Sequence, residues 1–294
     1  ERAILPRAST GYAATMAANA DSAPAGSMQA SLPMYDLPEV RAATDAWWSG
    51  VAAWLGRMGI ASVPSRLTRP ADVWAAWRDP ALLLSQCCGY ALAGPLAPYL
   101  KVVATPCYAA PGCAGPSYTS AVVVHAEETR NNLAQLRGAV VAYNERWSHS
   151  GYNALRAQVA PLAQEGHFFS TALPTGSHAA SLELVARGRA DVTAVNAVVW
   201  ALLGRDRPQA RQALRVLTWT EPAPGLPYVT AAHRHDSTIR QMRAAVEQAM
   251  RDPGLAAARE TLLLDGAAFL EAPDYAALAW AETRARALGY PQLA

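Results

Sequence analysis

Short, uninterrupted apolar runs alternate along the chain with longer segments of helical periodicity. Three consecutive leucines, 82–84, form the centre of the run 81–85, and similar runs occupy 101–105, 139–143 and 191–195. Contiguous apolar residues over about four to eight positions are typical of strands covered on both faces of a sheet. Further strands are predicted at 28–32, 118–124, 168–172, 213–218 and 228–231.

Apolar residues at helical spacing fill the segments between these strands. In 38–58 the positions Val40, Trp47, Val51 and Met58 share one helix face, and Gly59 follows as a stop. Strands that alternate with helices in short units indicate an α/β fold. The other longer helices are predicted at 71–78, 151–164, 179–187, 197–203, 237–250, 254–264 and 274–288.

Composition supports a globular chain that is large enough for two lobes. The 294 residues are 52% apolar and 16% charged, and the net charge is +2. A domain of this length buries a substantial core, whereas a disordered chain would be poorer in apolar residues. The basic residues form no stripe, and only Lys101 among them is a lysine. Nucleic acid is therefore not an expected partner.

The N-terminal residues 1–27 are rich in Ala, Ser, Gly and Pro. They contain no apolar core of the kind that marks an intact signal peptide. We interpret them as an extension and place the start of the folded part at Met28. No apolar window of about 18 residues occurs, so no membrane-spanning helix is expected.

The turn that follows the strand 139–143 is the most distinctive candidate site. It carries two hydroxyls, Ser148 and Ser150, and a helix is predicted to open at Gly151. The first turn of a helix has unpaired N–H donors and a partial positive charge. Such an end, with hydroxyl groups beside it, suits a small oxyanion. The serines could equally serve as plain helix caps, and the two roles are compatible.

Other polar and aromatic side chains follow the ends of the predicted strands. Ligands of open α/β sheets bind at the carboxyl ends of strands. Each residue also has an ordinary structural role available, as a turn residue, a cap or a core aromatic. The candidate ligand-binding residues, besides the two serines and Gly151, are Tyr35, Gln86, Tyr90, Tyr118, Asn144, His149, His178, Asn196 and Tyr228.

Catalytic motifs are missing from the sequence. The segment 148–151 lacks the first glycine of a G-x-S-x-G nucleophile turn, and neither a P-loop, a G-x-G-x-x-G pattern nor an H-E-x-x-H pair occurs. A catalytic triad would need His178 with an acid such as Asp191, which instead fits the start of a strand. An enzymatic function is not predicted, and no cofactor or metal is indicated.

The chain has four cysteines, which allow three full pairings. None is spaced like a zinc ligand pair. Buried free thiols are one interpretation. In an oxidising compartment, a bridge from the 87–88 turn to the loop that holds Cys107 and Cys113 is the alternative.

Several segments together resemble the phosphate/phosphonate-type substrate-binding proteins of ABC importers, a branch of the type II periplasmic binding proteins. Their order and spacing carry the resemblance, which covers about 28–232, whereas each motif alone is weak. The segments are Gln86-Cys87-Cys88-Gly89-Tyr90, Pro111-Gly112-Cys113-Ala114-Gly115 with Tyr118 and Ser120, Asn144 with Ser148-x-Ser150-Gly151, Thr175-Gly176-Ser177-His178 with Ser181 and the run 185–191, and Pro224-Gly225-Leu226-Pro227-Tyr228.

The resemblance implies an α/β fold of two lobes, each a mixed, mainly parallel sheet flanked by helices, with two hinge crossovers. Lobe 1 would comprise 28–121 and 222–294, and lobe 2 would comprise 122–221. The lobes would close on a small oxyanion such as a phosphonate, a phosphite or a phosphate ester. An ABC permease is the implied membrane partner and the periplasm the implied location. We expect a monomer without cofactors.

The resemblance also assigns residues. Its oxyanion-binding turn corresponds to Ser148, Ser150 and Gly151, its histidine to His178, and its opposing tyrosines to Tyr35 and Tyr90. It implies a Cys88–Cys113 disulfide and leaves Cys87 and Cys107 able to form a second one.

One position departs from the family pattern. Relatives often have an acidic residue where this chain has Asn196, and an acid there could bind an amine group of a ligand. Its absence favours a simple oxyanion or one with a neutral tail. The alternatives are an enzyme on the same scaffold, similar to pyrimidine-precursor synthases, and a soluble ligand sensor.

Overall fold

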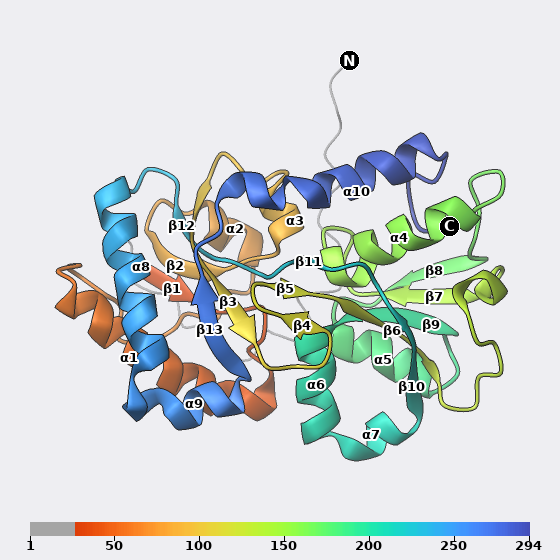
Figure 1. Ribbon diagram of the computed structural model, residues 1–294, viewed down its shortest axis with the longest axis horizontal. Coiled ribbons are helices and arrows are strands. Elements are labelled where there is room, and N and C mark those ends of the chain that lie inside the picture. Colours follow the sequence, from red (N-terminus) through yellow and green to blue (C-terminus); the bar gives the residue numbers. More distant parts are fainter. Residues whose placement is uncertain (1–26) are drawn as a thin grey trace.

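The computed structural model describes residues 27–294, which form two five-stranded sheets with a small three-stranded sheet between them (Figure 1). Helices cover both five-stranded sheets, so the predicted α/β class is confirmed. Of the predicted extension 1–27, only Ser27 lies within the described residues. Within 27–294, no helix combines the length and the apolar character that crossing a membrane requires.

The strands are short, and most begin and end within two residues of the predicted runs. They are β1 (Gln29–Ser31), β2 (Leu82–Gln86), β3 (Leu100–Tyr108), β4 (Cys113–Ala114), β5 (Ser117–Tyr118), β6 (Ser120–His125), β7 (Val140–Tyr143), β8 (Thr171–Pro174), β9 (Val192–Asn196), β10 (Leu214–Trp219), β11 (Ala223–Pro224), β12 (Tyr228–Ala231) and β13 (Leu264–Ala268).

The α-helices lie between the strands and in the C-terminal third of the chain. They are α1 (Arg41–Arg57), α2 (Val73–Arg78), α3 (Gly89–Leu92), α4 (Ala154–Val159), α5 (His178–Ala186), α6 (Ala197–Asp206), α7 (Pro208–Gln212), α8 (Asp236–Arg251), α9 (Ala256–Thr261) and α10 (Ala276–Ala287).

The first sheet has the strand order β1-β2-β12-β3-β13. Strands β1 and β2 pair in parallel, and β12 is inserted antiparallel between β2 and β3. Helix α1 packs against α8 and α9 beside this sheet (Figure 1). Its buried positions Trp47, Trp48, Val51 and Leu55 repeat at helical spacing, which explains why this segment forms a helix with one apolar face.

The second sheet has the order β10-β6-β9-β7-β8. Strands β9, β7 and β8 are parallel, and β6 is inserted antiparallel between β10 and β9. Parallel strands end at the same edge of a sheet, so the loops after β7, β8 and β9 lie next to one another. Ser148 and Ser150 follow β7, His178 follows β8 as the first residue of α5, and Asn196 is the last residue of β9.

Two connections join the sheets, and they run side by side. The chain leaves the first sheet through β4 and β5, and it returns through β11. Strand β11 pairs antiparallel with β5, with Ala223 opposite Tyr118. Further along, the Ser120 N–H donates to Thr220 Oγ1 at 2.8 Å, and the Thr220 N–H donates to the Ser120 carbonyl. The two crossovers are therefore hydrogen-bonded to each other.

The C-terminal segment crosses to the second sheet without joining it. Helix α10 packs against α4, and Tyr290 and Leu293 belong to the hydrophobic cluster of the second sheet. The Ala294 carbonyl accepts the N–H groups of Phe168 and Phe169. These bonds hold the Phe168–Phe169 pair outside the sheet, so β8 starts at Thr171 and not at the predicted residue 168.

Strand β13 was not expected, because 262–264 continues the apolar pattern of the preceding helix. The helix prediction for 254–264 is wrong at its end. Leu263 has a φ of +58°, a left-handed conformation that a helix cannot propagate. Helix α9 therefore stops at Thr261, and β13 begins at Leu264 as an antiparallel edge strand on β3.

Candidate functional site

The turn after β7 forms a cradle that consists of the Ser148 and Ser150 hydroxyls and the backbone of Gly151. The Ser148 and Ser150 Oγ atoms lie 3.4 Å apart, and the Gly151 N–H donates to Ser148 Oγ at 3.1 Å. Ser148 thus caps the helical segment, which opens with a π-helical turn, His149–Asn153. π-helical turns are rare and occur frequently at functional sites. Both serines are buried.

Gly151 allows a very close approach to this turn. A Cβ atom at residue 151 would overlap Asn144 Oδ1 and would lie 3.0 Å from His178 Cε1. Asn144 and His178 therefore pack directly against the backbone of the cradle, and a side chain at residue 151 would displace them. Asn144 Oδ1 is buried and has no hydrogen-bond partner within 27–294.

His178 completes the cradle from the neighbouring loop. It is the first residue of α5, and Ser177 caps that helix by accepting the Ala180 N–H. Its Nε2 forms a 3.0 Å hydrogen bond with Ser150 Oγ. Desolvation lowers the pKa of His178 to about 4, so the ring is neutral near pH 7.

His149 lies between the two serines in sequence, and its ring contacts residues of other elements. Asn153 Nδ2 donates to His149 Nδ1 at 3.2 Å, and the ring packs between Tyr90 and Tyr118. Desolvation, with a smaller contribution from the nearby Arg156 charge, lowers the pKa of His149 to about 4. His149 is buried, and its ring is therefore neutral near pH 7.

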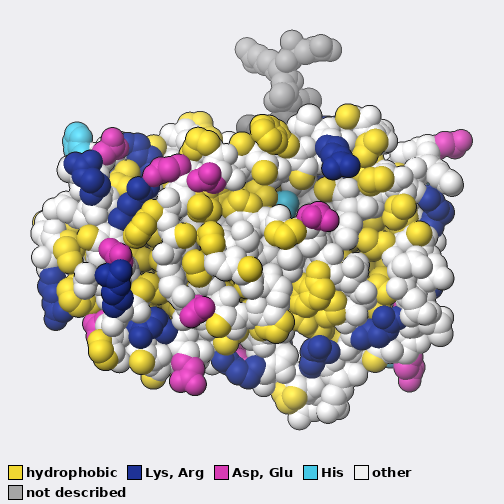
Figure 2. Space-filling model, in the orientation of Figure 1, with side chains coloured by type: hydrophobic (Ala, Val, Ile, Leu, Met, Phe, Trp, Pro, Cys, Tyr) yellow, Lys and Arg dark blue, Asp and Glu magenta, His cyan; other side chains and the backbone are white. Residues whose placement is uncertain are grey.

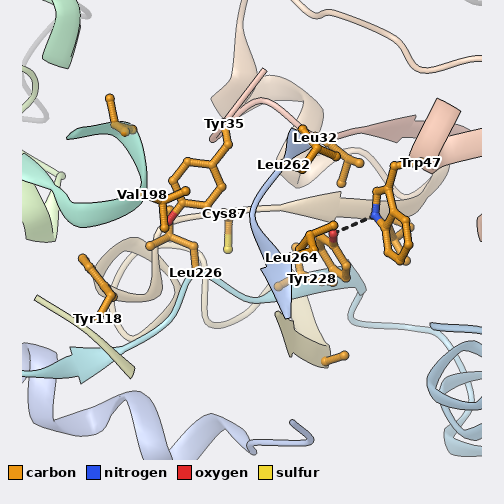
Figure 3. Close-up of a cluster of buried hydrophobic side chains, with 14 of the residues drawn as sticks. Leu32, Tyr35, Trp47, Cys87, Tyr118, Val198, Leu226, Tyr228, Leu262 and Leu264 are labelled. Atoms are coloured by element: carbon orange, nitrogen blue, oxygen red, sulfur yellow. Dashed lines mark hydrogen bonds between the residues drawn. The ribbon is translucent and has the colours of Figure 1, made fainter. Parts of the chain in front are cut away.

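Tyr35, in the loop after β1, contacts the end of β9, and Tyr118, in β5, contacts His149 in the turn after β7. The Tyr35 hydroxyl donates to Asn196 Oδ1 at 3.2 Å, which joins the loop after β1 to the end of β9. Tyr35 lies beside Val198 and Leu226, with Tyr118 nearby (Figure 3). Burial raises the pKa of both tyrosines well above the ordinary value, so both hydroxyls stay protonated.

Gln86 and Tyr228 are buried residues of β2 and β12 in the first sheet. Gln86 Nε2 donates to the Tyr108 hydroxyl and to the Leu226 carbonyl. The Tyr228 hydroxyl accepts a 2.9 Å bond from Trp47 Nε1, drawn as the dashed line in Figure 3. Together with Tyr35 they line a small cavity of about 20 Å³. Tyr108 packs edge-on against Tyr35 and was not among the predicted site residues, because it lies beyond the predicted strand 101–105, whereas β3 extends to Tyr108.

Tyr90 contacts both α10 and the turn after β7. Its hydroxyl donates to Glu282 of α10. Its ring packs against Trp147, which is 44% exposed and also contacts Trp74. Tyr90 therefore presents its ring and not its hydroxyl towards the turn after β7. Glu282 lies 192 residues further along the chain, and nothing in the local sequence around Tyr90 indicates it as the hydrogen-bond partner.

The predicted disulfides are wrong, because all four cysteines are free. Cys88 Sγ instead accepts the His149 N–H at 3.4 Å, which ties α3 to the turn after β7. Cys87 is completely buried beside it. Burial is the largest influence on every one of these thiols and raises its pKa, which makes the thiols weak nucleophiles at neutral pH.

The cradle itself consists of hydroxyl and backbone amide groups, with the neutral His178 imidazole beside it. Such groups can donate hydrogen bonds to an oxyanion in a site where burial strengthens each bond. Charged side chains are scattered over the outer surface, where Lys and Arg occur in separate groups on the face shown in Figure 2.

The fold is that of two-lobed periplasmic binding proteins. PhnD1 of Prochlorococcus marinus, solved with methylphosphonate, is 15% identical, and the match covers 88% of this chain and 98% of that chain with a TM-score of 0.71. A binding protein component of an ABC phosphonate transporter from Pseudomonas aeruginosa is also 15% identical, over 89% and 87% of the chains, with a TM-score of 0.71. A Xanthomonas citri protein solved with ATP is 16% identical, over 89% and 98%, with a TM-score of 0.67.

The family follows from the sequence itself. The signature of the periplasmic substrate-binding proteins of phosphonate ABC transporters matches residues 90–275, which is more than half of the chain. The chain belongs to this family, whose members are transporter binding proteins and not enzymes. No curated protein sequence matches the chain.

Proposed function

We propose that the protein is a receptor that binds a small phosphonate or a related oxyanion between its lobes and delivers it to an ABC permease. The observation that carries the proposal is the cradle, where the Ser148 and Ser150 hydroxyls lie 3.4 Å apart after β7 and His178 forms a hydrogen bond with Ser150. Hydrogen bonds to an anion from such groups contribute about 1.5–3 kcal/mol each. The structure of PhnD1 with methylphosphonate supports the ligand class.

Binding is proposed to proceed by hinge closure. We take 28–121 with 222–294 as lobe 1 and 122–221 as lobe 2, with α10 extending across to lobe 2. One hydrophobic cluster includes Tyr35 and Leu226 of lobe 1 and Val198 of lobe 2, so the lobes are in contact. Opening about the paired crossovers would separate these residues and expose the cradle. A ligand that bridges both lobes would then favour the closed arrangement.

The partners follow from this role. The permease would recognise the outer surface of the closed protein, and the family's description as periplasmic substrate-binding proteins supports a periplasmic location. The proposal includes a monomeric receptor that acts without a cofactor or a metal.

Calorimetric titration tests the proposal. Methylphosphonate, phosphite, phosphate and methanesulfonate would each be added to the purified protein. Saturable binding of one ligand per chain is expected for at least one of the phosphorus compounds. Methanesulfonate has tetrahedral geometry but one negative charge at most, so it serves as a comparison for charge. The absence of binding heat with all four compounds would contradict the proposed function.

A further inference from the structure

Asn196 ends β9 with a carboxamide whose orientation is fixed by its partners. Its Oδ1 accepts the Val198 N–H at 2.9 Å and the Tyr35 hydroxyl at 3.2 Å. A backbone N–H can only donate, so the atom that faces Val198 must be the oxygen. The two N–H donors of Nδ2 therefore form the free end of the group. This nitrogen is buried and has no hydrogen-bond partner within 27–294.

Ser120 lies directly opposite Asn196, and its side chain likewise has no hydrogen-bond partner among the described residues. The two residues are partners in the antiparallel pairing of β6 with β9, so their side chains lie on the same face of the sheet. Ser120 is 1% exposed, and its Oγ has no hydrogen-bond partner among the described residues. Its backbone is held by Thr220 at the hinge. Two buried polar groups without partners at adjacent positions cost free energy unless another molecule satisfies them.

This pair lies beside the oxyanion cradle. Strands β7 and β9 are parallel neighbours, about 4.8 Å apart as in any sheet, and both end at the same edge. The cradle follows β7, Asn196 ends β9, and the π-helical turn contacts β9. A molecule held at Ser148 and Ser150 can therefore reach Asn196 with a substituent of a few atoms.

We infer that Asn196 and Ser120 form a second polar subsite, which receives a hydrogen-bond acceptor at the far end of the ligand. The inference rests on the proposed function and narrows its ligand class to phosphonates that carry a second oxygen group, such as a carboxylate. Asn196 Nδ2 donates two hydrogen bonds there and the Ser120 hydroxyl donates a third. An ammonium group would meet the donor end of Asn196 and find only the Ser120 oxygen as an acceptor.

The Asn196→Asp variant tests whether the subsite prefers an acceptor to an ammonium group, and it keeps the shape of the side chain. One carboxylate oxygen keeps the bonds to Val198 and Tyr35, and the other replaces the N–H donors by an acceptor. Phosphonoacetate and 2-aminoethylphosphonate are the probes, because they have similar lengths and opposite charges at the far end. The wild type should bind phosphonoacetate at least about tenfold more tightly, and the variant should prefer 2-aminoethylphosphonate.

Two further variants complete the experiment. Asn132→Asp changes an exposed asparagine that also caps a helical turn, through the Gln135 N–H, and should leave the preference unchanged. Ser120→Ala should weaken phosphonoacetate binding severalfold, because it removes one of the three hydrogen-bond donors of the subsite.

The outcomes separate this inference from the proposed function. The ratio of the dissociation constants for phosphonoacetate and 2-aminoethylphosphonate could be the same in the wild type and in Asn196→Asp. That result would mean that Asn196 and Ser120 hold only water, and it would overturn the subsite. If methylphosphonate, phosphonoacetate and 2-aminoethylphosphonate all fail to bind the wild type, the proposed function itself is wrong.

Discussion

Replacing both serines of the cradle is expected to weaken methylphosphonate binding by at least about 100-fold. The Ser148→Ala/Ser150→Ala variant loses two hydroxyl donors, each contributing about 1.5–3 kcal/mol to binding of an anion, and every 1.4 kcal/mol is a factor of ten in affinity. Titration calorimetry on the variant and the wild type measures the change. Ser49→Ala, at an exposed position of α1, is the matched control and should bind like the wild type.

The stability of the double variant must be followed in the same experiment. Ser148 also accepts the Gly151 N–H, and loss of such a cap costs about 1 kcal/mol. A modest fall in melting temperature is therefore expected, with the fold retained. Ser150→Ala alone removes no cap and should still weaken binding by about tenfold or more. Affinities within twofold of the wild type for both variants would show that the cradle is not the anion site.

Acid is expected to destabilise the protein through His149. Its pKa is about 4 in the folded chain, against an ordinary value of about 6.5 when unfolded. Between these values the unfolded state binds the proton and the folded state does not, so stability falls as the pH drops from about 6.5 to about 4. The loss from His149 is up to about 3 kcal/mol. The pKa of His178 is also lowered in the folded chain, so His178 adds to the loss of stability in acid.

Thermal unfolding followed by circular dichroism at pH 7 and pH 5 tests this expectation. His149→Gln removes the titrating group and should reduce the fall in melting temperature between the two pH values. His233→Gln, at an exposed position, is the control and should leave the fall unchanged. An equal fall in the wild type and in His149→Gln would contradict the assignment of the acid sensitivity to His149.

The sheet strands could be predicted largely from sequence because they are buried on both faces. The run 82–84 has no polar residue to compete with a strand, and β2 forms there. Where the apolar pattern fits two structures, prediction failed. The segment 262–264 continues a helix pattern equally well, and the positive φ of Leu263 that ends the helix has no sequence signal comparable to a glycine.

The cradle could also be recognised in advance, because serines beside a helix start are a local signal. His178 likewise follows a capping serine, and the structure brings it to Ser150. Partners from distant parts of the chain were not predictable. Tyr228 bonds Trp47, and Tyr90 bonds Glu282, through packing that only the folded chain creates. The disulfide prediction failed for the same reason, since the partner of Cys88 is the His149 amide.

A crystal structure of the protein with methylphosphonate tests the central claim most directly. The proposed function predicts phosphonate oxygens at hydrogen-bonding distance, about 2.5–3.0 Å, from Ser148 Oγ and Ser150 Oγ, with the lobes closed over the ligand. A ligand bound elsewhere, or in the cleft without contact to either serine, would contradict it.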